Sequence, residues 1–208
     1  MPQPYNGSGL RVKFGNKSLS ANPEISRRIA RIIGEAAMTD AHIGQVLSRL
    51  LGGKEALGFR LYYSIRNSSV RNDLLQVIVD DRAPKRKAKR IQNAFDSVES
   101  TLKDRHRLAH GIWVQDLDAV DDLIVVDTKD LTQYMEESLT YLVRNHGLVY
   151  TLDDLDRALR GIKALNRELV EIAVALPARR ARRSASRERP KDSQQSPRLP
   201  LSPPAKQK

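Results

Sequence analysis

The sequence contains no cysteine, which excludes disulfide bridges, thiolate metal sites and cysteine nucleophiles. This composition suits a reducing cytosol, and we expect a cytoplasmic protein. No apolar run approaches the roughly 20 residues that a helix needs to cross a bilayer. The first residues, Met-Pro-Gln-Pro, also lack the apolar core of a signal peptide. We therefore expect no membrane contact.

Acidic residues are too few to balance the basic ones, and the net charge is +11 over 208 residues. Residues 177–208 hold 10 Lys and Arg against 2 Asp and Glu, which leaves 26 basic and 23 acidic residues elsewhere. This basic segment has almost no apolar residues, so we predict a disordered tail. It either contacts phosphate backbones nonspecifically or only keeps the protein soluble. Residues 1–21, mixed in Pro, Gly, Asn and Ser, are predicted to be a flexible arm with no assigned function.

The intervening residues 22–176 carry apolar residues at helical spacing. Asn22 followed by Pro23 predicts a helix start, and Gly52-Gly53 predicts its end. Later helices are predicted within 54–81, with a break at the polar run 66–69, and over 85–110, 131–145 and 152–176. Residues 112–114 and 123–126, on either side of an acidic turn, predict a β-hairpin. The expected fold is all-α: an antiparallel bundle of four to five helices with a small β-hairpin after the third helix.

Residues 104–113, Asp-Arg-His-Arg-Leu-Ala-His-Gly-Ile-Trp, concentrate two of the four histidines and the only tryptophan. On a helix, Arg105 lies on the apolar stripe that includes Leu102, with His106 at its edge and Arg107 on the far side, toward water. An arginine on a buried stripe needs a partner. Glu35 and Asp40 are candidates, although both also fit ordinary surface acids.

Two interpretations of this segment remain open. In one, Arg105 pairs with a carboxylate of a neighbouring helix, and His110 is a side chain at the helix end. In the other, Arg105, His106 and His110 form a phosphate-handling site. Residues five apart lie about 140° apart on a helix, so this site requires the helix to end or bend between Arg105 and His110. Gly111 is expected to supply that end by taking a positive φ.

The pattern Arg-polar-three residues-His, here Arg105, His106 and His110, resembles the signature of the HEPN superfamily. The longer phrase Arg-X-Arg-Leu-Ala-His-Gly-X-Trp is similar to small bacterial proteins of that superfamily, where Asn is commoner at the position of His106. The resemblance implies a homodimer whose two motifs share one cleft, and a metal-independent endoribonuclease of toxin or defence type. His110, or secondly His106, would act as acid or base, and Arg105 would stabilise charge on the phosphate. No cofactor or metal is expected, and an antitoxin-type protein partner is possible.

A non-catalytic helical module, in which the same residues bind RNA or a nucleotide or hold a dimer, is the alternative. The basic run that opens the third helix opposes the helix dipole and indicates a nearby anion, or else is simply a solvated face. We expect six residues to contact nucleic acid: Lys85, Arg86, Lys87, Lys89, Arg90 and Arg107. His42 and His146 are expected to be structural.

Overall fold

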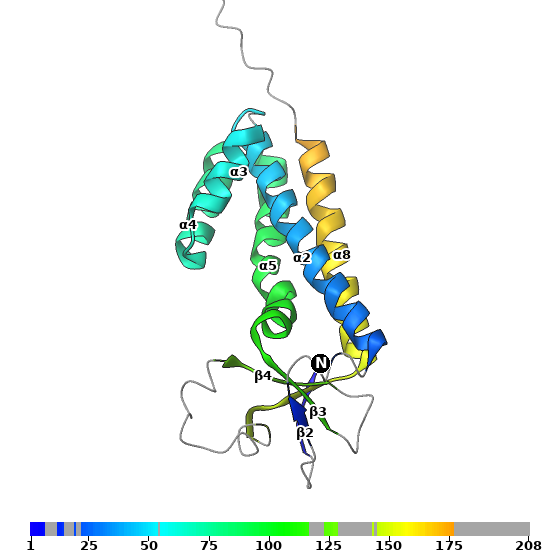
Figure 1. Ribbon diagram of the computed structural model, residues 1–208. Helices are drawn as coiled ribbons and strands as arrows, with labels where there is room; N and C mark the ends of the chain where they lie inside the picture. Colours follow the sequence, from blue (N-terminus) through cyan, green and yellow to red (C-terminus); the bar gives the residue numbers. More distant parts are fainter. Residues whose placement is uncertain are drawn as a thin grey trace, which may run out of the picture.

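The computed structural model describes residues 1–6, 12–14, 19, 22–53, 55–116, 123–128, 143 and 145–176. Within these residues the molecule is mostly helical, with five helices and a small antiparallel sheet below them (Figure 1). The tail expected at 177–208 lies outside the described residues, as does the helix expected at 131–145 apart from residues 143 and 145. No helix in the described ranges combines the length and the apolarity that crossing a bilayer requires.

Helix α2 (Pro23–Leu50) begins and ends at the residues that the sequence indicates. The side chain of Asn22 accepts a hydrogen bond from the amide of Ile25 at 3.1 Å, and Pro23 occupies the first turn. Gly52 and Gly53 follow the helix with φ of 93° and 84°, a conformation that other residues rarely adopt. Both predicted ends are confirmed, and they lie where local chemistry decides the structure.

The second helical region is divided, as predicted, at its polar run. Helix α3 spans Glu55–Ser64 and helix α4 spans Ser68–Arg82. Asn67 begins α4, and its side chain accepts hydrogen bonds from the amides of Ser69 at 2.9 Å and Val70 at 3.2 Å. Helix α3 packs on α2, while α4 packs on α5 (Lys85–His110) and on α2.

Helix α8 (Leu152–Ala175) runs beside α2 and α5 (Figure 1). Thr151 and Asp154 form the predicted capping box, in which the Thr151 hydroxyl accepts from the Asp154 amide at 3.2 Å. Arg28 of α2 donates to Asp156 at 2.9 Å at this end of the helix. The lower ends of α2 and α8 are therefore fixed to each other just above the sheet.

The sheet has the strand order β1-β5-β4-β3-β2, with all neighbours antiparallel. Its strands are β1 (Gln3–Pro4), β2 (Val12–Phe14), β3 (Ile112–Asp116), β4 (Leu123–Val126) and β5 (Leu148–Tyr150). The predicted hairpin is confirmed as β3 and β4, in which Val114 pairs with Ile124.

The segment expected to be a flexible arm contributes both edge strands in its described residues, β1 and β2. Tyr5, only 7% exposed, anchors the first of them, and its amide donates to Gly147 at 2.9 Å. These described residues therefore belong to the folded unit. The sequence interpretation had placed the start of that unit at residue 22.

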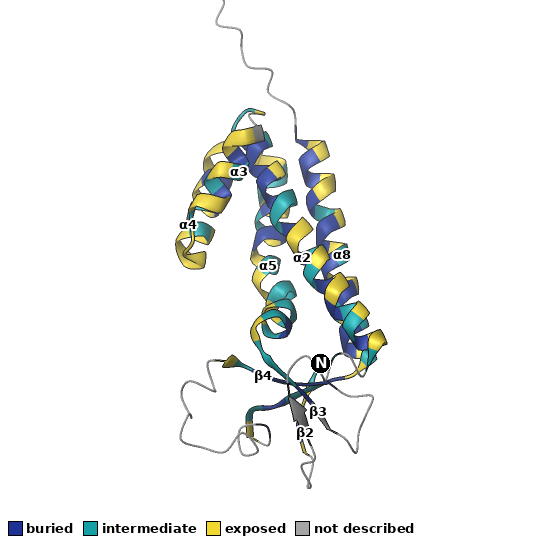
Figure 2. Ribbon diagram, viewed as in Figure 1, coloured by how far each residue is buried: buried dark blue, intermediate teal, exposed yellow. Residues whose placement is uncertain are grey.

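Buried side chains lie along the inner faces of the helices and through the middle of the sheet (Figure 2). One cluster joins all five helices at the end remote from the sheet. A second cluster joins the lower parts of α2, α5 and α8 to β4 and β5, and it contains the fully buried Leu108 of α5. The Trp113 indole donates to the Leu108 carbonyl at 2.9 Å. The end of α5, which carries the Arg-His segment, is thus held firmly against the sheet.

Candidate active site

Helix α5 continues through His110 and passes directly into β3. Gly111 has φ −77° and ψ 161°, and its amide donates to the Arg107 carbonyl at 2.7 Å. The expected positive φ is therefore wrong. Glycine is needed here because β4 approaches so closely: a Cβ at this position would lie 2.4 Å from Cγ1 of Val125 and 3.0 Å from the Val126 carbonyl oxygen.

His110 therefore stays on the helix and pairs with His106 one turn earlier. Their ring centroids are 4.8 Å apart with planes tilted by 54°, and both residues are exposed. The structure brings the two histidines together where the sequence interpretation had joined His110 to Arg105. An imidazole pair that faces solvent can both accept and deliver a proton, since imidazole ionises near neutral pH.

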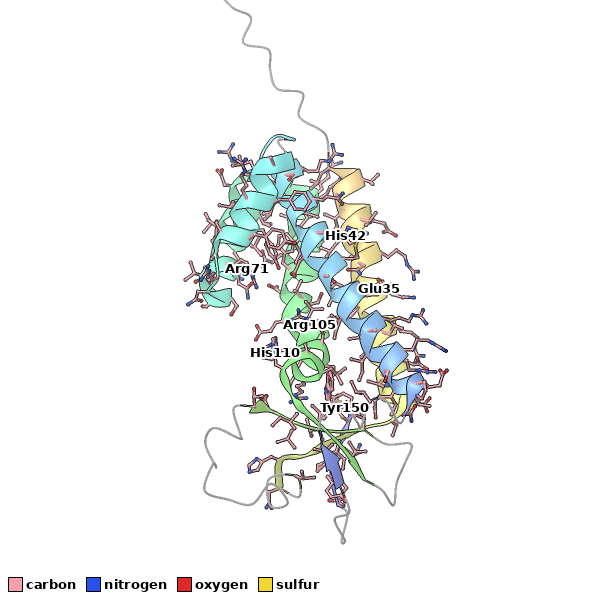
Figure 3. The ribbon with its side chains drawn as sticks, in the orientation of Figure 1. Glu35, His42, Arg71, Arg105, His110 and Tyr150 are labelled. Atoms are coloured by element: carbon pink, nitrogen blue, oxygen red, sulfur yellow. The ribbon has the colours of Figure 1, made fainter. Side chains whose placement is uncertain are left out.

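Arg105 lies on the neighbouring face of α5, and Figure 3 shows it with His110 on the last turns of the helix, above the sheet. Its Nε atom is buried and has no hydrogen-bond partner within the described part of the chain. Such an unsatisfied donor costs about 1–3 kcal/mol, and it is well suited to receive an anionic oxygen.

Neither expected carboxylate is a partner of this arginine. Glu35 accepts a hydrogen bond from Nδ2 of Asn166 at 3.2 Å and lies 3.8 Å from Nζ of Lys163, both on α8. Asp40 accepts a hydrogen bond from the Tyr62 hydroxyl at 2.7 Å. Both acids are therefore used in contacts between helices.

Arg107 does not point freely to water as expected. Its Nη1 lies 3.9 Å from Oδ1 of Asp104, which also accepts a hydrogen bond from the Tyr150 hydroxyl at 2.9 Å. Burial, followed by the Asp104 carboxylate, raises the pKa of Tyr150, so that its hydroxyl remains a donor. The side chain of Arg107 is only 27% exposed, and this group secures the helix end to β5. Sequence reasoning missed Asp104 and Tyr150, although Asp104 stands at the i,i+3 spacing of a helical ion pair.

The basic run at the start of α5 divides into two groups. Lys87 donates to the Ala175 carbonyl at the end of α8, and Arg90 bonds both oxygens of Glu168 at 2.6 and 2.8 Å. Arg90 also reaches Glu171 at 2.7 Å. These two cations tie α5 to α8, which is a structural use that the prediction of a nucleic-acid contact did not include.

The other three basic residues, Lys85, Arg86 and Lys89, are exposed. Lys89 borders a shallow groove of about 470 Å³ between α5 and α8, whose wall includes Glu168. They lie at the end of α5 remote from the two histidines, about 20 residues and roughly 30 Å along the helix axis. The fold does not bring the basic run and the Arg-His segment together.

The remaining histidines are separate from this site. Nδ1 of His42 lies 3.4 Å from Oε1 of Gln45 on α2, and His146 lies two residues before the start of β5. In the described ranges no three His, Asp or Glu side chains converge to hold a metal ion.

No protein-family model, curated protein or solved structure matches this chain. The site must therefore be interpreted from its own residues.

Proposed function

We propose that the protein is a HEPN-like, metal-independent endoribonuclease of toxin or defence type, whose helices form the antiparallel bundle typical of that superfamily. The observation that supports this proposal most directly is the contact between His106 and His110 beside an arginine, Arg105, with an unsatisfied buried Nε. Two acid–base groups and one fixed cation are the groups that RNA cleavage without a metal requires.

In this reaction the 2′-hydroxyl of the RNA attacks the adjacent phosphorus. One histidine removes the 2′-hydroxyl proton, the bond between the 2′-oxygen and phosphorus forms, and the bond to the 5′-oxygen breaks. The other histidine protonates the departing 5′-oxygen. The products are a 2′,3′-cyclic phosphate and a free 5′-hydroxyl, with no net gain or loss of protons. His110 is our first choice for the principal acid or base, and His106 is the second.

Arg105 would hold the non-bridging phosphate oxygens. A guanidinium donates from Nε and one terminal nitrogen in parallel, which matches two phosphate oxygens. Because its Nε is covered in this structure, a phosphate oxygen would reach that atom only after the surrounding side chains move, and it would then satisfy the donor. Negative charge that develops on the non-bridging phosphate oxygens during cleavage would be stabilised from the side of the helix next to the histidines.

The HEPN resemblance also implies a homodimer across the motif and, for a toxin, an antitoxin-type protein partner. We include both in the proposal. The partly buried Leu102 near Arg105 packs against the chain's own second core cluster, so a shared cleft would have to be formed by the exposed residues of α5.

A second candidate function is a non-catalytic module that associates through α4. Val70 and Val77, seven residues apart on this helix, are 54% and 63% exposed, and Leu57 of α3 is 45% exposed. Residues at this spacing lie on one face of a helix, so the two valines form a short apolar stripe on the solvent side of α4, interrupted by the exposed Asp73. Such a stripe is typical of a surface that binds another protein.

The proposal is tested by incubating the purified full chain with single-stranded RNA, with and without EDTA. We expect cleavage that EDTA leaves unchanged and products that end in a cyclic phosphate. His110→Ala should lower the rate by at least about 100-fold, the usual contribution of an acid–base group. His42→Ala is the matched control, because it removes a histidine whose contact is with Gln45.

Full activity of the His110→Ala and His106→Ala variants would refute the assigned roles. Failure of the unsubstituted chain to cleave any RNA would favour the binding module. A loss of activity that accompanies a lowered melting temperature would point to a structural role, so thermal unfolding is recorded for each variant.

A further inference from the structure

Tyr63, at the end of α3, is an exposed aromatic residue beside a buried one. It is 58% exposed, whereas the adjacent Tyr62 is only 3% exposed. The two rings meet nearly at right angles, with centroids 5.4 Å apart and an interplanar angle of 79°. Tyr63 is therefore held in place from one side while much of its ring remains open to solvent.

The support beneath this ring is rigid. The Tyr62 hydroxyl donates to Asp40 of α2 at 2.7 Å, and the guanidinium carbon of Arg71 lies 4.7 Å from the centre of the Tyr62 ring. Three helices, α2, α3 and α4, thus contribute one side chain each to a fixed cluster. A ring held in this way loses little conformational entropy when a flat ligand stacks on it.

Three arginines lie near Tyr63 in the chain or in the cluster that supports it. Arg60 lies one helical turn before Tyr63 on α3, Arg66 lies in the short link to α4, and Arg71 lies in the first turns of α4. Arg60 and Arg66 are exposed, and neither has an ion-pair partner among the residues that the structure describes. They contrast with Arg90, whose charge is used on α8.

This cluster includes a residue of α4, which packs on the helix that carries the candidate active site. Asn72 of α4 lines a small pocket of about 160 Å³ together with Asp96 and Glu99 of α5, so the start of α4 lies beside that part of α5. Arg105 follows six to nine residues later, roughly 9–14 Å along the helix axis. In Figure 3, Arg71 on α4 lies above Arg105 and His110, which are on the last turns of α5.

We propose that Tyr63, together with Arg60, Arg66 and Arg71, forms a stacking platform that holds an unpaired base of single-stranded RNA next to the cleavage site. The inference rests on the proposed ribonuclease function and identifies the substrate class as single-stranded. An aromatic face accepts any base, while arginines attract the phosphates on either side of it. The platform takes the role that sequence reasoning gave to the basic run of α5.

The test measures binding without cleavage. The full chain carrying His106→Ala and His110→Ala is titrated into a short fluorescently labelled single-stranded RNA, and anisotropy gives the Kd. In this background Tyr63→Ala should weaken binding about tenfold, the usual effect of losing one stacked base. Tyr63→Phe, which keeps the ring, should bind like the parent. Arg66→Ala should weaken binding and reduce the slope of log K against log salt by about one.

Val174→Ala is the matched control, because it removes an exposed apolar side chain from α8, outside both the platform and the α4 stripe, and should leave the Kd unchanged. Unaltered binding by Tyr63→Ala, an equal loss with Tyr63→Phe, or no RNA binding by the parent would each overturn the platform. Cleavage is scored separately with His106 and His110 intact. If the protein cleaves RNA but Tyr63→Ala leaves binding unaltered, the stacking platform is refuted and the nuclease is not. If Tyr63→Ala weakens binding tenfold but the protein with both histidines never cleaves RNA, the nuclease is refuted and the platform is not.

Discussion

Substituting Gly111 by alanine tests whether the end of α5 is fixed by close packing or by a special backbone conformation. Its φ of −77° and ψ of 161° are open to any residue, so alanine introduces no backbone strain. Reduced freedom of the unfolded chain would even stabilise the alanine variant by about 0.4–1 kcal/mol. Any loss of stability must therefore come from contacts of the new methyl group.

Those contacts are severe. The methyl carbon would lie 2.4 Å from Cγ1 of Val125 and 2.6 Å from the Arg107 carbonyl oxygen. The side chain of Val125 is buried, and the carbonyl accepts the Gly111 amide at 2.7 Å, so neither can move without loss. Overpacking of a core usually costs about 1–3 kcal/mol. Subtracting the gain in the unfolded state, we expect Gly111→Ala to destabilise the protein by about 1 kcal/mol.

Urea unfolding followed by far-ultraviolet circular dichroism measures this difference. Gly34→Ala is the control, because Gly34 is an exposed residue of α2 with no atom within 4 Å of an added Cβ, and alanine there should stabilise by about 0.5–1 kcal/mol. Gly111→Asn separates the two explanations. Asparagine tolerates positive φ but is larger than alanine, so close packing makes it the worse substitution. A milder effect of asparagine than of alanine would refute the packing explanation.

Two further predictions concern the helices around α4. Burial, followed by the hydrogen bond to Asp40, raises the pKa of Tyr62 above its ordinary value of 10.0. The contribution of Tyr62 to the free energy of unfolding is therefore complete below about pH 10 and decreases as the pH rises above that value, because the tyrosine ionises first in the unfolded chain. Tyr62→Phe should reduce the slope of this decrease by at most about 1.4 kcal/mol per pH unit. If α4 is a dimer interface, Val77→Glu should weaken self-association at least about tenfold in sedimentation, while Val174→Glu, at a 79% exposed position of α8, should not. Equal sedimentation of Val77→Glu and the parent would exclude the α4 stripe.

The helix boundaries could be predicted because the signals are local. Asn22 bonds the amide three residues later, and Thr151 exchanges bonds with Asp154 within one turn. Gly52 and Gly53 take positive φ where α2 ends. Each signal is complete within a few residues, so the sequence alone specifies it.

The candidate site was predicted less well because contacts from distant parts of the chain decide its geometry. Gly111 stands in the expected place after the helix, but Val125 of β4 determines its conformation. Arg107 turns to Asp104 because Tyr150 of β5 shares the same carboxylate. The helical periodicity of α5 contains no information on strands β4 and β5, and it therefore predicted that Arg107 faces water.

The basic run shows the same limit for electrostatics. Lys87 and Arg90 find their partners on α8, 88 and 78 residues later in the chain. Composition identified the excess of positive charge but not which charges are neutralised in the fold. The arginines around Tyr63, spread singly over two helices and their link, do not form a run and so gave no signal in the sequence.

The surroundings of Arg105 bear on the two interpretations that the sequence left open. The structural interpretation requires a carboxylate of a neighbouring helix, and both expected acids are engaged elsewhere, Glu35 with α8 and Asp40 with Tyr62. An unsatisfied buried donor lowers stability by about 1–3 kcal/mol, and replacing the arginine by an apolar residue would remove that loss. The phosphate site that we propose would account for keeping the arginine, because a bound anion would satisfy the donor. In that proposal the two histidine rings, one face away on the same helix, would act on the bonds of that phosphate.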